Sequence, residues 1–522
     1  MSNPSPKKGG GIYWTFKHSK DGLWRFFKRH KLIFITLLVV IAVFLFTGRA
    51  YIHHLVIAIR IRSFAIIFAA MLLALAWWVI RKWPKLYRYA TLAVVAIALL
   101  LSQKVIVNVH DYLSLYYRYK TLKIYEPGEL PVTGHERIHP LNSVYSLALE
   151  VMTEVEQPTL PSFVRIGDDY RWIMAIEPSY PISRLFGGIS EIYSVTATGP
   201  SPNFSRENRL KVAFETGESL LMSHNTKVSV IRSFGLWRFL HYEPSDITYF
   251  LDDKEEWVQV VSLIRWRGIF FPRPEFGGVQ IIRQRKHNPL RTAWRSLFGI
   301  GEWVKPKEIS KHEFLVGQNI LSTKVSRYVA NSLRFQDGFF APFPGYHRGD
   351  VRIPDLPEDI NDQPFAAFFT MPGLKGELLH YFSLEPYDPD KQGLNTSLFV
   401  PADGTERVFV YRHHRQTGTL TGVSAISGKV MQSMMNYDWD RNTPVEHRPF
   451  IRNIGGQTRF FWLTTVVTRT ESAGNKRFIG GSIPQVVITD ARYNIPVWVN
   501  VLNPDSWLEE IEAKLTNVWA QE

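Results

Sequence analysis

LIFITLLVVIAVFLFT, residues 32–47, is the first of three apolar runs, and SFAIIFAAMLLALAWWVI at 63–80 and ATLAVVAIALLLS at 90–102 follow it. A helix needs about 20 apolar residues to cross a bilayer core, and each run reaches that length together with its flanks. The tail of 31 residues before the first run is long for a signal peptide. The runs predict an α-helical transmembrane anchor of about three spans within residues 32–110.

Positive charge is concentrated around these runs. The whole net charge of +14 falls before residue 104, where Asp21 is the only acidic residue, and the remaining residues are neutral as a whole. Since a nucleic-acid-binding domain needs excess positive charge to hold phosphates, nucleic acid is not an expected partner. The lipid bilayer is the expected partner of the basic segments.

The distribution of Lys and Arg also predicts the orientation of the anchor. The tail 1–31 and the loop 81–89 carry more of them than the loop 48–62, which places the N-terminus in the cytoplasm and the large C-terminal part outside it. Segment 51–62, YIHHLVIAIRIR, leaves an alternative open, because the topology inverts if this segment spans the membrane. The simpler interpretation is an interfacial stretch whose Arg60 and Arg62 reach water.

The sequence changes character after the third run. DYLSLYYRYKTLKIY at 111–125 predicts a helix that leaves the membrane, with an interfacial belt of tyrosines. Further on, short segments rich in β-branched and aromatic residues are bounded by Gly, Pro, Asn or Asp, as strands are. These segments are RLKVAFET (209–216), TKVSVIRS (226–233), WVQVVSLIRW (257–266), GGVQIIRQ (277–284), RVFVYRHH (407–414) and PQVVITDA (484–491). They predict a large, mainly-β (α+β) soluble region.

Three helices are expected within this region. Asn288 and Pro289 open one that runs to Gly299, and Ser310 with Glu313 forms a capping box that opens a longer helix toward Phe335. The C-terminal helix begins near Pro504 and is amphipathic. The expected organisation is a basic cytoplasmic tail (1–31), transmembrane helices (32–110), a juxtamembrane helix and linker (111–140), a β-rich domain (141–300) and a second α+β domain (301–522).

An internal repeat is suggested by three aromatic strands, each followed by a Gly-Gly pair and another strand. The strands begin near Trp172, Trp257 and Trp462, and the glycine pairs are 187–188, 277–278 and 480–481. The third copy ends in Asp-Ala and a turn, and this arrangement resembles the PepSY-type β modules of bacterial envelope proteins over a short part of the chain. Arg492, Tyr493 and Asn494 stand where those modules carry Thr-Gly.

The string His135, Glu136, Arg137, Ile138, His139 has the H-E-x-x-H form of zinc metallopeptidases. On a helix, one turn would bring His135 and His139 to the same zinc ion, with Glu136 as the general base. Pro140 disfavours a helical His139, and spacing specifies no third ligand. We therefore expect an extended linker here and keep the zinc site as the alternative.

Two acidic runs, beginning at Asp388 and at Asp438, resemble the start of a calcium loop. Phe399 and Pro449 stand where such a loop needs a bidentate glutamate, so both runs are expected to be turns.

Two other polar clusters are expected on the surface. The acidic residues at 252–256 open a strand, and His413 with His414 follows another. Adjacent histidines on a strand point to opposite faces and do not readily share a metal.

The absence of cysteine excludes disulfides, thiolate metal sites and cysteine nucleophiles. The sequence therefore favours a membrane-anchored scaffold of the cell envelope whose extracytoplasmic β-rich domain binds another membrane or envelope protein, or its own copies, without catalysis and without a cofactor. The alternatives are a membrane-bound zinc metallopeptidase using Glu136, and an accessory subunit of a transporter or secretion complex.

Overall fold

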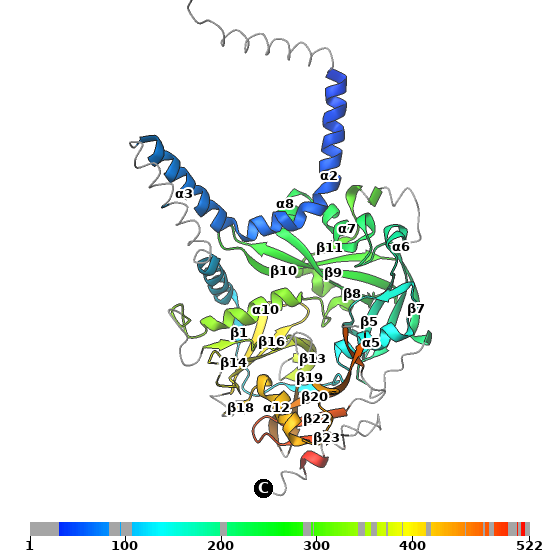
Figure 1. Ribbon diagram of the computed structural model, residues 1–522, viewed down its shortest axis with the longest axis vertical. Coiled ribbons are helices and arrows are strands. Elements are labelled where there is room, and N and C mark those ends of the chain that lie inside the picture. The colour runs from blue at the N-terminus through cyan, green and yellow to red at the C-terminus, as the bar shows by residue number, and fades with distance from the viewer. Residues whose placement is uncertain are drawn as a thin grey trace, which may run out of the picture. The chain divides into compact units, whose positions relative to one another are not determined.

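The computed structural model describes residues 31–82, 94, 107–198, 206–284, 294–295, 297–342, 350–356, 363–371, 374–388, 390–413, 419–454, 456–472, 475–479, 485–499, 509 and 513–516. The chain forms two compact units, Met1–His53 and His54–Glu522. The second unit contains every strand that the structure describes, and we call residues 123–499 the β domain (Figure 1).

Two helices precede the β domain, α2 (Lys31–Ile61) and α3 (Ser63–Lys82). Among the described residues no single helix has the length and apolar composition to cross a membrane, although the bent pair Gly48–Ile61 and Ser63–Trp78 reaches both together, with a 68° bend. The second apolar run is helical, as expected, but the third lies outside the described residues except for Val94. The structure therefore does not support the three-span anchor.

The C-terminal turn of α2 is fastened to the β domain. The guanidinium of Arg60 donates hydrogen bonds to the carbonyl oxygens of Trp266 (3.1 Å) and Gly268 (2.9 Å). Arg62 lies 3.6 Å from the carboxylate of Asp111. Segment 51–62 is thus mostly part of α2, and Arg60 contacts backbone carbonyls where we expected it to reach water.

The helix expected at 111–125 is found at 107–121, and residues 123–125 form a strand instead. Its tyrosines were expected in a membrane interface, yet Tyr112 and Tyr116 pack edge-on against Phe335 and Phe339. The hydroxyl of Tyr112 also donates to the carbonyl oxygen of Phe339. Most of this aromatic surface therefore packs inside the protein, and Tyr117 remains largely exposed.

A seven-stranded sheet lies at the centre of the β domain, in the order β1, β17, β16, β14, β13, β2, with β12 also paired to β14. β1 pairs parallel to β17, and the other pairs are antiparallel. The bounds are β1 Lys123–Tyr125, β2 Val132–Gly134, β12 Val351–Arg352, β13 Phe365–Met371, β14 Leu374–Pro386, β16 Thr396–Pro401 and β17 Arg407–Arg412. The segment expected as a juxtamembrane helix and linker, 111–140, thus also supplies two strands of the central sheet.

Both faces of the central sheet are covered by other elements. Successive residues of a strand point to opposite faces, so neighbouring residues pack against different elements. Phe382 of β14 packs with α10 (Thr323–Ser332) and Trp266 on one side. Its neighbour Tyr381 packs on the other side with Trp462 and α12 (Val423–Ser433). The strands β13, β14, β16 and β17 accordingly carry buried apolar side chains on both faces.

The second face is closed by a sheet in the order β19, β20, β22, β23, with β21 paired to β20. Two further sheets have the orders β11, β10, β9, β8 and β3, β5, β6, β7, with β4 paired to β5, and β15 pairs with β18. Their bounds are β3 Glu156–Pro158, β4 Ser162–Ile166, β5 Asp169–Pro178, β6 Ile189–Thr196, β7 Arg209–Phe214, β8 Tyr242–Leu251, β9 Trp257–Arg267, β10 Arg273–Arg283, β11 Glu302–Val304, β15 Gly393–Leu394, β18 Leu420–Thr421, β19 Asn442–Ile454, β20 Gln457–Ser472, β21 Asn475–Ile479, β22 Gln485–Asp490 and β23 Pro496–Val499.

Short helices connect the strands: α5 Leu141–Val151, α6 Pro181–Phe186, α7 Thr226–Ser233, α8 Leu236–His241, and 3-10 turns at Arg206–Asn208, Met222–His224, Pro306–Lys311, Glu313–Leu315 and Leu333–Phe335. The expectation of a strand at 226–233 is wrong. The side chain of Asn225 accepts a hydrogen bond from the backbone N–H of Val228 and so caps a helix there.

The expectation of one long helix from Ser310 to Phe335 is also wrong. The segment forms two 3-10 turns, then α10, then a third 3-10 turn, and Gly317 interrupts it in a left-handed conformation (φ 69°). The first 3-10 turn begins where the backbone N–H of Lys305 donates to the carboxylate of Glu308 (3.3 Å). Of the helix expected near 288–299, residues 294–295 and 297–298 are described and helical, as are 509 and 513–516 of the C-terminal helix.

The three aromatic strands of the suggested repeat are β5, β9 and β20, and they lie in three different sheets. α6 separates β5 from the first glycine pair, whereas the pair 277–278 forms a β-bulge inside β10. The third pair lies outside the described residues. The expected boundary between two domains at 300–301 falls between β10 and β11, which pair with each other.

Candidate functional site

The H-E-x-x-H string forms an extended strap across the β domain. Residues 135–139 contain no helix, and His135 has a positive φ of 51°. The ring of His135 packs against Tyr170 and Phe368, both at 5.0 Å between ring centroids. Ile138 is fully buried in an apolar cluster with Phe461. The string therefore lacks the helical turn that brings two histidines to one zinc ion in metallopeptidases.

The two charged residues of the strap are buried in ion pairs. The carboxylate of Glu136 lies 2.6 Å from the guanidinium of Arg452. Arg137 forms an ion pair with Glu446 and lies 4.8 Å from the ring centroid of Trp172. These contacts connect β19 to β5 through the strap and indicate a structural role.

Glu446 forms ion pairs with two arginines and accepts a hydrogen bond from one backbone N–H. Besides Arg137 it pairs with Arg448 (3.2 Å) and accepts a hydrogen bond from the backbone N–H of Leu141 (2.7 Å). Burial lowers the pKa of Arg448 to about 9, while the negative charge of Glu446 opposes this. Within the described residues no group of three His, Asp or Glu is arranged to hold a metal ion.

Three serine–histidine pairs, each with a buried imidazole, raise the question of nucleophilic catalysis. They are Ser326 with His380 (2.6 Å), Ser397 with His413 (2.8 Å) and Ser427 with His447 (2.6 Å). The expectation that His413 lies on the surface is wrong, because its side chain is fully buried.

The second ring nitrogen of His380 contacts Asn319 (2.8 Å), and that of His447 contacts Thr464 (2.9 Å). A catalytic triad would place a carboxylate there. Burial lowers the pKa of His380 to about 4, and burial together with Arg448 lowers that of His447 to about 3. These imidazoles stay neutral and internal, which indicates that they stabilise the fold.

Asp252, expected at a solvated edge, is buried as well. Its carboxylate accepts the backbone N–H groups of Lys254 and Glu256 and pairs with Arg283. Burial alone would raise the pKa of Asp252, but these hydrogen bonds outweigh it and lower the pKa. Asp388 and Asp438 each accept a nearby backbone N–H, as the expected turns require.

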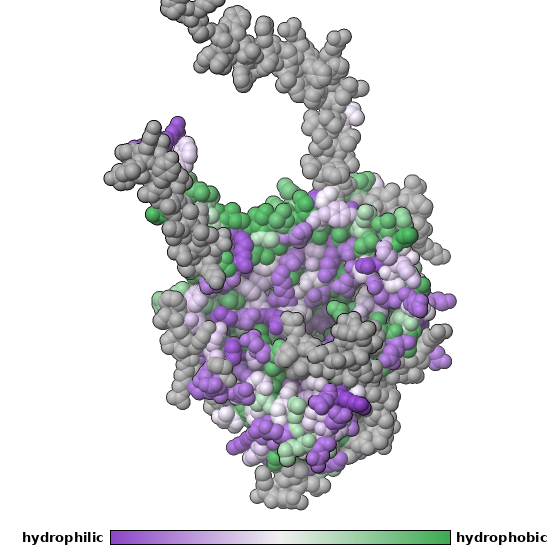
Figure 2. Space-filling view, in the orientation of Figure 1, coloured by the Kyte–Doolittle hydropathy of each residue, from purple (hydrophilic) through white to green (hydrophobic). Residues whose placement is uncertain are grey.

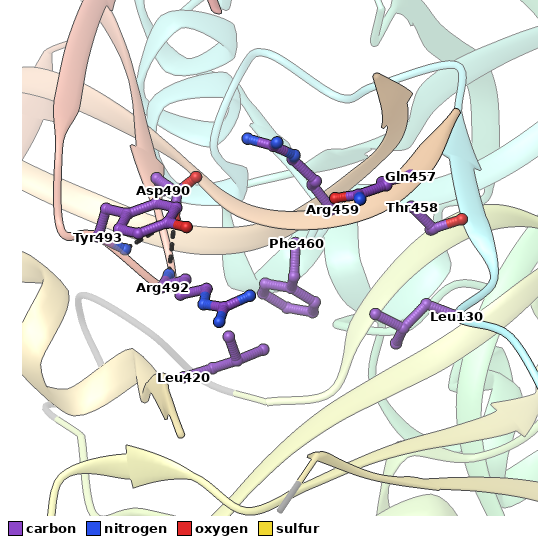
Figure 3. Close-up of a pocket in the computed structure, with 9 residues that line it drawn as sticks. All are labelled: Leu130, Leu420, Gln457, Thr458, Arg459, Phe460, Asp490, Arg492 and Tyr493. Atoms are coloured by element: carbon purple, nitrogen blue, oxygen red, sulfur yellow. Dashed lines mark hydrogen bonds between the residues drawn. The ribbon is translucent and has the colours of Figure 1, made fainter. Parts of the chain in front are cut away.

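Figure 3 shows a small cavity at the edge of β20 and β22. Its volume is about 100 Å³, and Asp490 closes the adjoining turn by accepting the backbone N–H groups of Arg492 (2.6 Å) and Tyr493 (2.9 Å). Cavities that bind metabolites usually measure about 300 Å³ or more. A larger hollow of about 700 Å³ lies beside β10, and Arg283, Trp294 and Arg295 are among the residues that line it.

The end of α2 and the adjoining part of the β domain form a conspicuous apolar surface. We call it the end face, and it consists of Leu55, Ile59, Leu236, Trp237, Leu240, Ile269 and Phe270. Leu236, Ile269 and Trp237 are 75%, 71% and 65% exposed. Figure 2 shows hydrophobic residues gathered along the end of the domain that carries α8 and the beginning of α3. Soluble surfaces seldom collect so many large apolar side chains, so this surface is a candidate for an interaction site.

The tight turn between β9 and β10 holds the end face in place. The carbonyl oxygen of Ile269 accepts a hydrogen bond from the hydroxyl of Ser63 (2.6 Å), at the start of α3. The ring of Phe271 lies 5.0 Å from that of Phe64, and the carbonyl oxygen of Pro272 accepts from Ser114 (2.8 Å). The turn is thus fastened both to α3 and to the helix 107–121.

Sequence reasoning missed the end face, although a signal was present. Apolar residues in a tight turn are unusual, because turns normally favour Gly, Pro, Asn, Asp and Ser. Ile269 and Phe270 occupy such a turn, and Trp237 stands in a helix of six residues that is too short to bury it.

Comparisons with known proteins returned no match: no family model, no curated protein and no solved structure is similar to this chain.

Proposed function

We propose that the protein is a membrane-anchored, non-catalytic interaction protein: the segments before residue 123 hold it in a bilayer, and the β domain presents a binding surface to a second protein. The observation that carries this proposal is the exposed end face. α3 begins beside these apolar residues, because the hydroxyl of Ser63 donates to the carbonyl oxygen of Ile269. Removing one large apolar side chain from water contributes about 1.5 to 3 kcal/mol, so a bilayer beside this face stabilises it appreciably.

The far end of α3 supports the same proposal. Trp77 and Trp78 are exposed there, and Arg81 and Lys82 lie 4.9 Å from their ring centroids. Tryptophan together with basic residues is typical of the boundary between a bilayer and water. The excess of positive charge in the N-terminal tail favours a cytoplasmic N-terminus.

The surface for a second protein is best sought at the opposite end of the domain, around α12 and β23 (Figure 1). Met434 and Met435 are exposed there beside Tyr437, Trp439 and Trp498, whose rings pack within 4.9 to 6.3 Å of one another. Methionine and aromatic residues are enriched in protein interfaces. We call these five residues the distal cluster.

Extraction of native membranes at alkaline pH tests the anchoring. We expect the full chain to remain with the membrane pellet and to dissolve only in detergent, because its attachment is apolar. Release into the alkaline supernatant would contradict the proposal.

Crosslinking tests the interaction. The full chain with a C-terminal tag is crosslinked in intact cells, and the attached proteins are identified by mass spectrometry. We expect one reproducible partner, a membrane or envelope protein or a second copy, and its loss in a Met435→Ala, Trp439→Ala variant. Val155→Ala, an exposed residue outside the distal cluster, is the control. Recovery of the same partner from all variants would show that the distal cluster is not the binding surface.

A further inference from the structure

A group of cations lies directly beside the end face. Arg238 belongs to α8, which packs on β8 and β9, and its guanidinium donates to the carbonyl oxygen of Ser233 (3.0 Å). Burial lowers the pKa of His241, and the positive charges of Arg60 and Arg265 lower it further. The geometry brings these three elements together, because Tyr242, the residue after α8, pairs with Arg265 of β9, and Arg60 of α2 donates to the carbonyl oxygen of Trp266.

No ion pair within the described part of the chain includes Arg60, Arg238 or Arg265. Glu275 stands opposite Arg265 in the β9–β10 register, but its carboxylate pairs with Arg267 and Arg273, at 3.5 and 3.2 Å. The three unneutralised charges therefore favour an anion that comes from outside the protein.

The order of the two features matches a membrane surface. Leu236 and Trp237 of α8 are exposed, whereas Arg238 of the same helix is half-buried. Arg60 lies at the end of α2 and Arg265 in β9. An apolar face enters a bilayer by about 5 to 10 Å, which leaves basic side chains behind it at the level of the phosphates. α3 begins at the same face, since Ser63 is bonded to Ile269.

We propose that the end face docks on the bilayer as a contact in addition to the anchor, and that Arg60, Arg238 and Arg265 bind acidic phospholipid headgroups there. This inference rests on the membrane anchoring proposed above. It adds the lipid class and the orientation of the β domain, whose distal cluster then faces away from the membrane. A basic side chain near an acidic membrane strengthens binding by about fivefold.

The absence of cysteine allows a direct test. Leu236→Cys provides a single thiol for an environment-sensitive dye on the full chain, reconstituted into vesicles of phosphatidylcholine with or without phosphatidylglycerol. We expect the dye to report an apolar environment and to be quenched by lipid-borne quenchers, more strongly with phosphatidylglycerol present. Asp168→Cys, in the exposed turn between β4 and β5, is the control and should report water in both vesicles.

The charge contribution is tested by Arg265→Gln in the Leu236→Cys background. We expect the equilibrium constant for docking on acidic vesicles to fall about fivefold. Arg441→Gln, an exposed arginine beside β19, should change nothing.

Each outcome separates the two proposals. A chain that inserts into vesicles while the dye at residue 236 reports water would overturn the docking and leave the anchoring intact. Docking that ignores both phosphatidylglycerol and Arg265→Gln would overturn the headgroup assignment. A chain that fails to enter either vesicle would overturn the anchoring itself.

Discussion

The strap at 135–139 and the end face differ in how far their side chains are exposed to solvent. The strap contains every residue type of a metallopeptidase site, yet the structure buries Glu136 against Arg452 and Ile138 in the core. The end face contains no catalytic motif, yet it exposes Leu236 and Trp237 to solvent. Accessibility therefore distinguishes the two regions better than residue type does.

Removing the charge of Glu446 should have the largest effect on the strap. The Glu446→Gln variant leaves Arg137 and Arg448 buried without their carboxylate, and breaking a buried ion pair costs about 3 to 5 kcal/mol. The measurement is denaturant unfolding of the full chain in detergent. Glu126→Gln, which removes an exposed partner of Arg412, should cost at most about 1 kcal/mol. Equal costs would show that the strap is not a structural element.

Acid should weaken the fold through its buried histidines. The pKa values of His380 and His447 lie below that of an unfolded histidine, at about 4 and about 3. Their contribution to stability is present above about pH 6.5 and is lost as the pH falls toward these values, by about 1.4 kcal/mol per pH unit for each histidine.

Unfolding measured between pH 7 and about pH 5 checks this slope, and a variant with His380→Asn and His447→Gln should flatten it. Burial raises the pKa values of Glu385 and Asp403, which acts in the opposite direction at lower pH. A wild-type profile that coincides with that of the double variant would refute the assignment.

The Glu136→Gln variant sharpens the comparison with a zinc site. Glutamine keeps an acceptor oxygen for Arg452 but loses the charge, so we expect a loss of about 1 to 2 kcal/mol in unfolding free energy. We expect elemental analysis to find the same zinc content in wild type and variant. Zinc that is stoichiometric with the wild type and absent from a His135→Ala, His139→Ala variant would restore the peptidase hypothesis.

The smallest effect is expected at the end face. Trp237→Ser should change the unfolding free energy by no more than about 0.5 kcal/mol in detergent, because the ring is largely exposed. Trp172→Ala, at a fully buried ring, should cost about 3 to 5 kcal/mol in the same assay. A similar cost at both positions would mean that Trp237 packs within the protein.

Local sequence patterns predicted those parts of the fold that depend on local chemistry. The alternation and turn residues around β7, β9, β10, β17 and β22 identified these strands, and α3 follows from its apolar composition. α7 was missed because Val228 and Ile231 resemble strand residues, while the cap formed by Asn225 decides for a helix.

The candidate site could not be predicted because its contacts join distant segments. Arg452 reaches Glu136 across more than 300 residues, and Ser397 meets His413 only after β16 and β17 have paired. Burial of a charged or polar side chain depends on such partners. A single sequence therefore shows which residues could do chemistry but leaves open which of them remain accessible.

The parallel pairing of β1 with β17 has a consequence for biosynthesis. Lys123 meets Arg407, so the first strand of the central sheet waits for a partner about 280 residues further along the chain. At a synthesis rate of roughly 5 to 20 residues per second, this delay lasts about 15 to 60 seconds. During that interval the partner edge of β1 is missing, and an unpaired strand edge can pair with another chain.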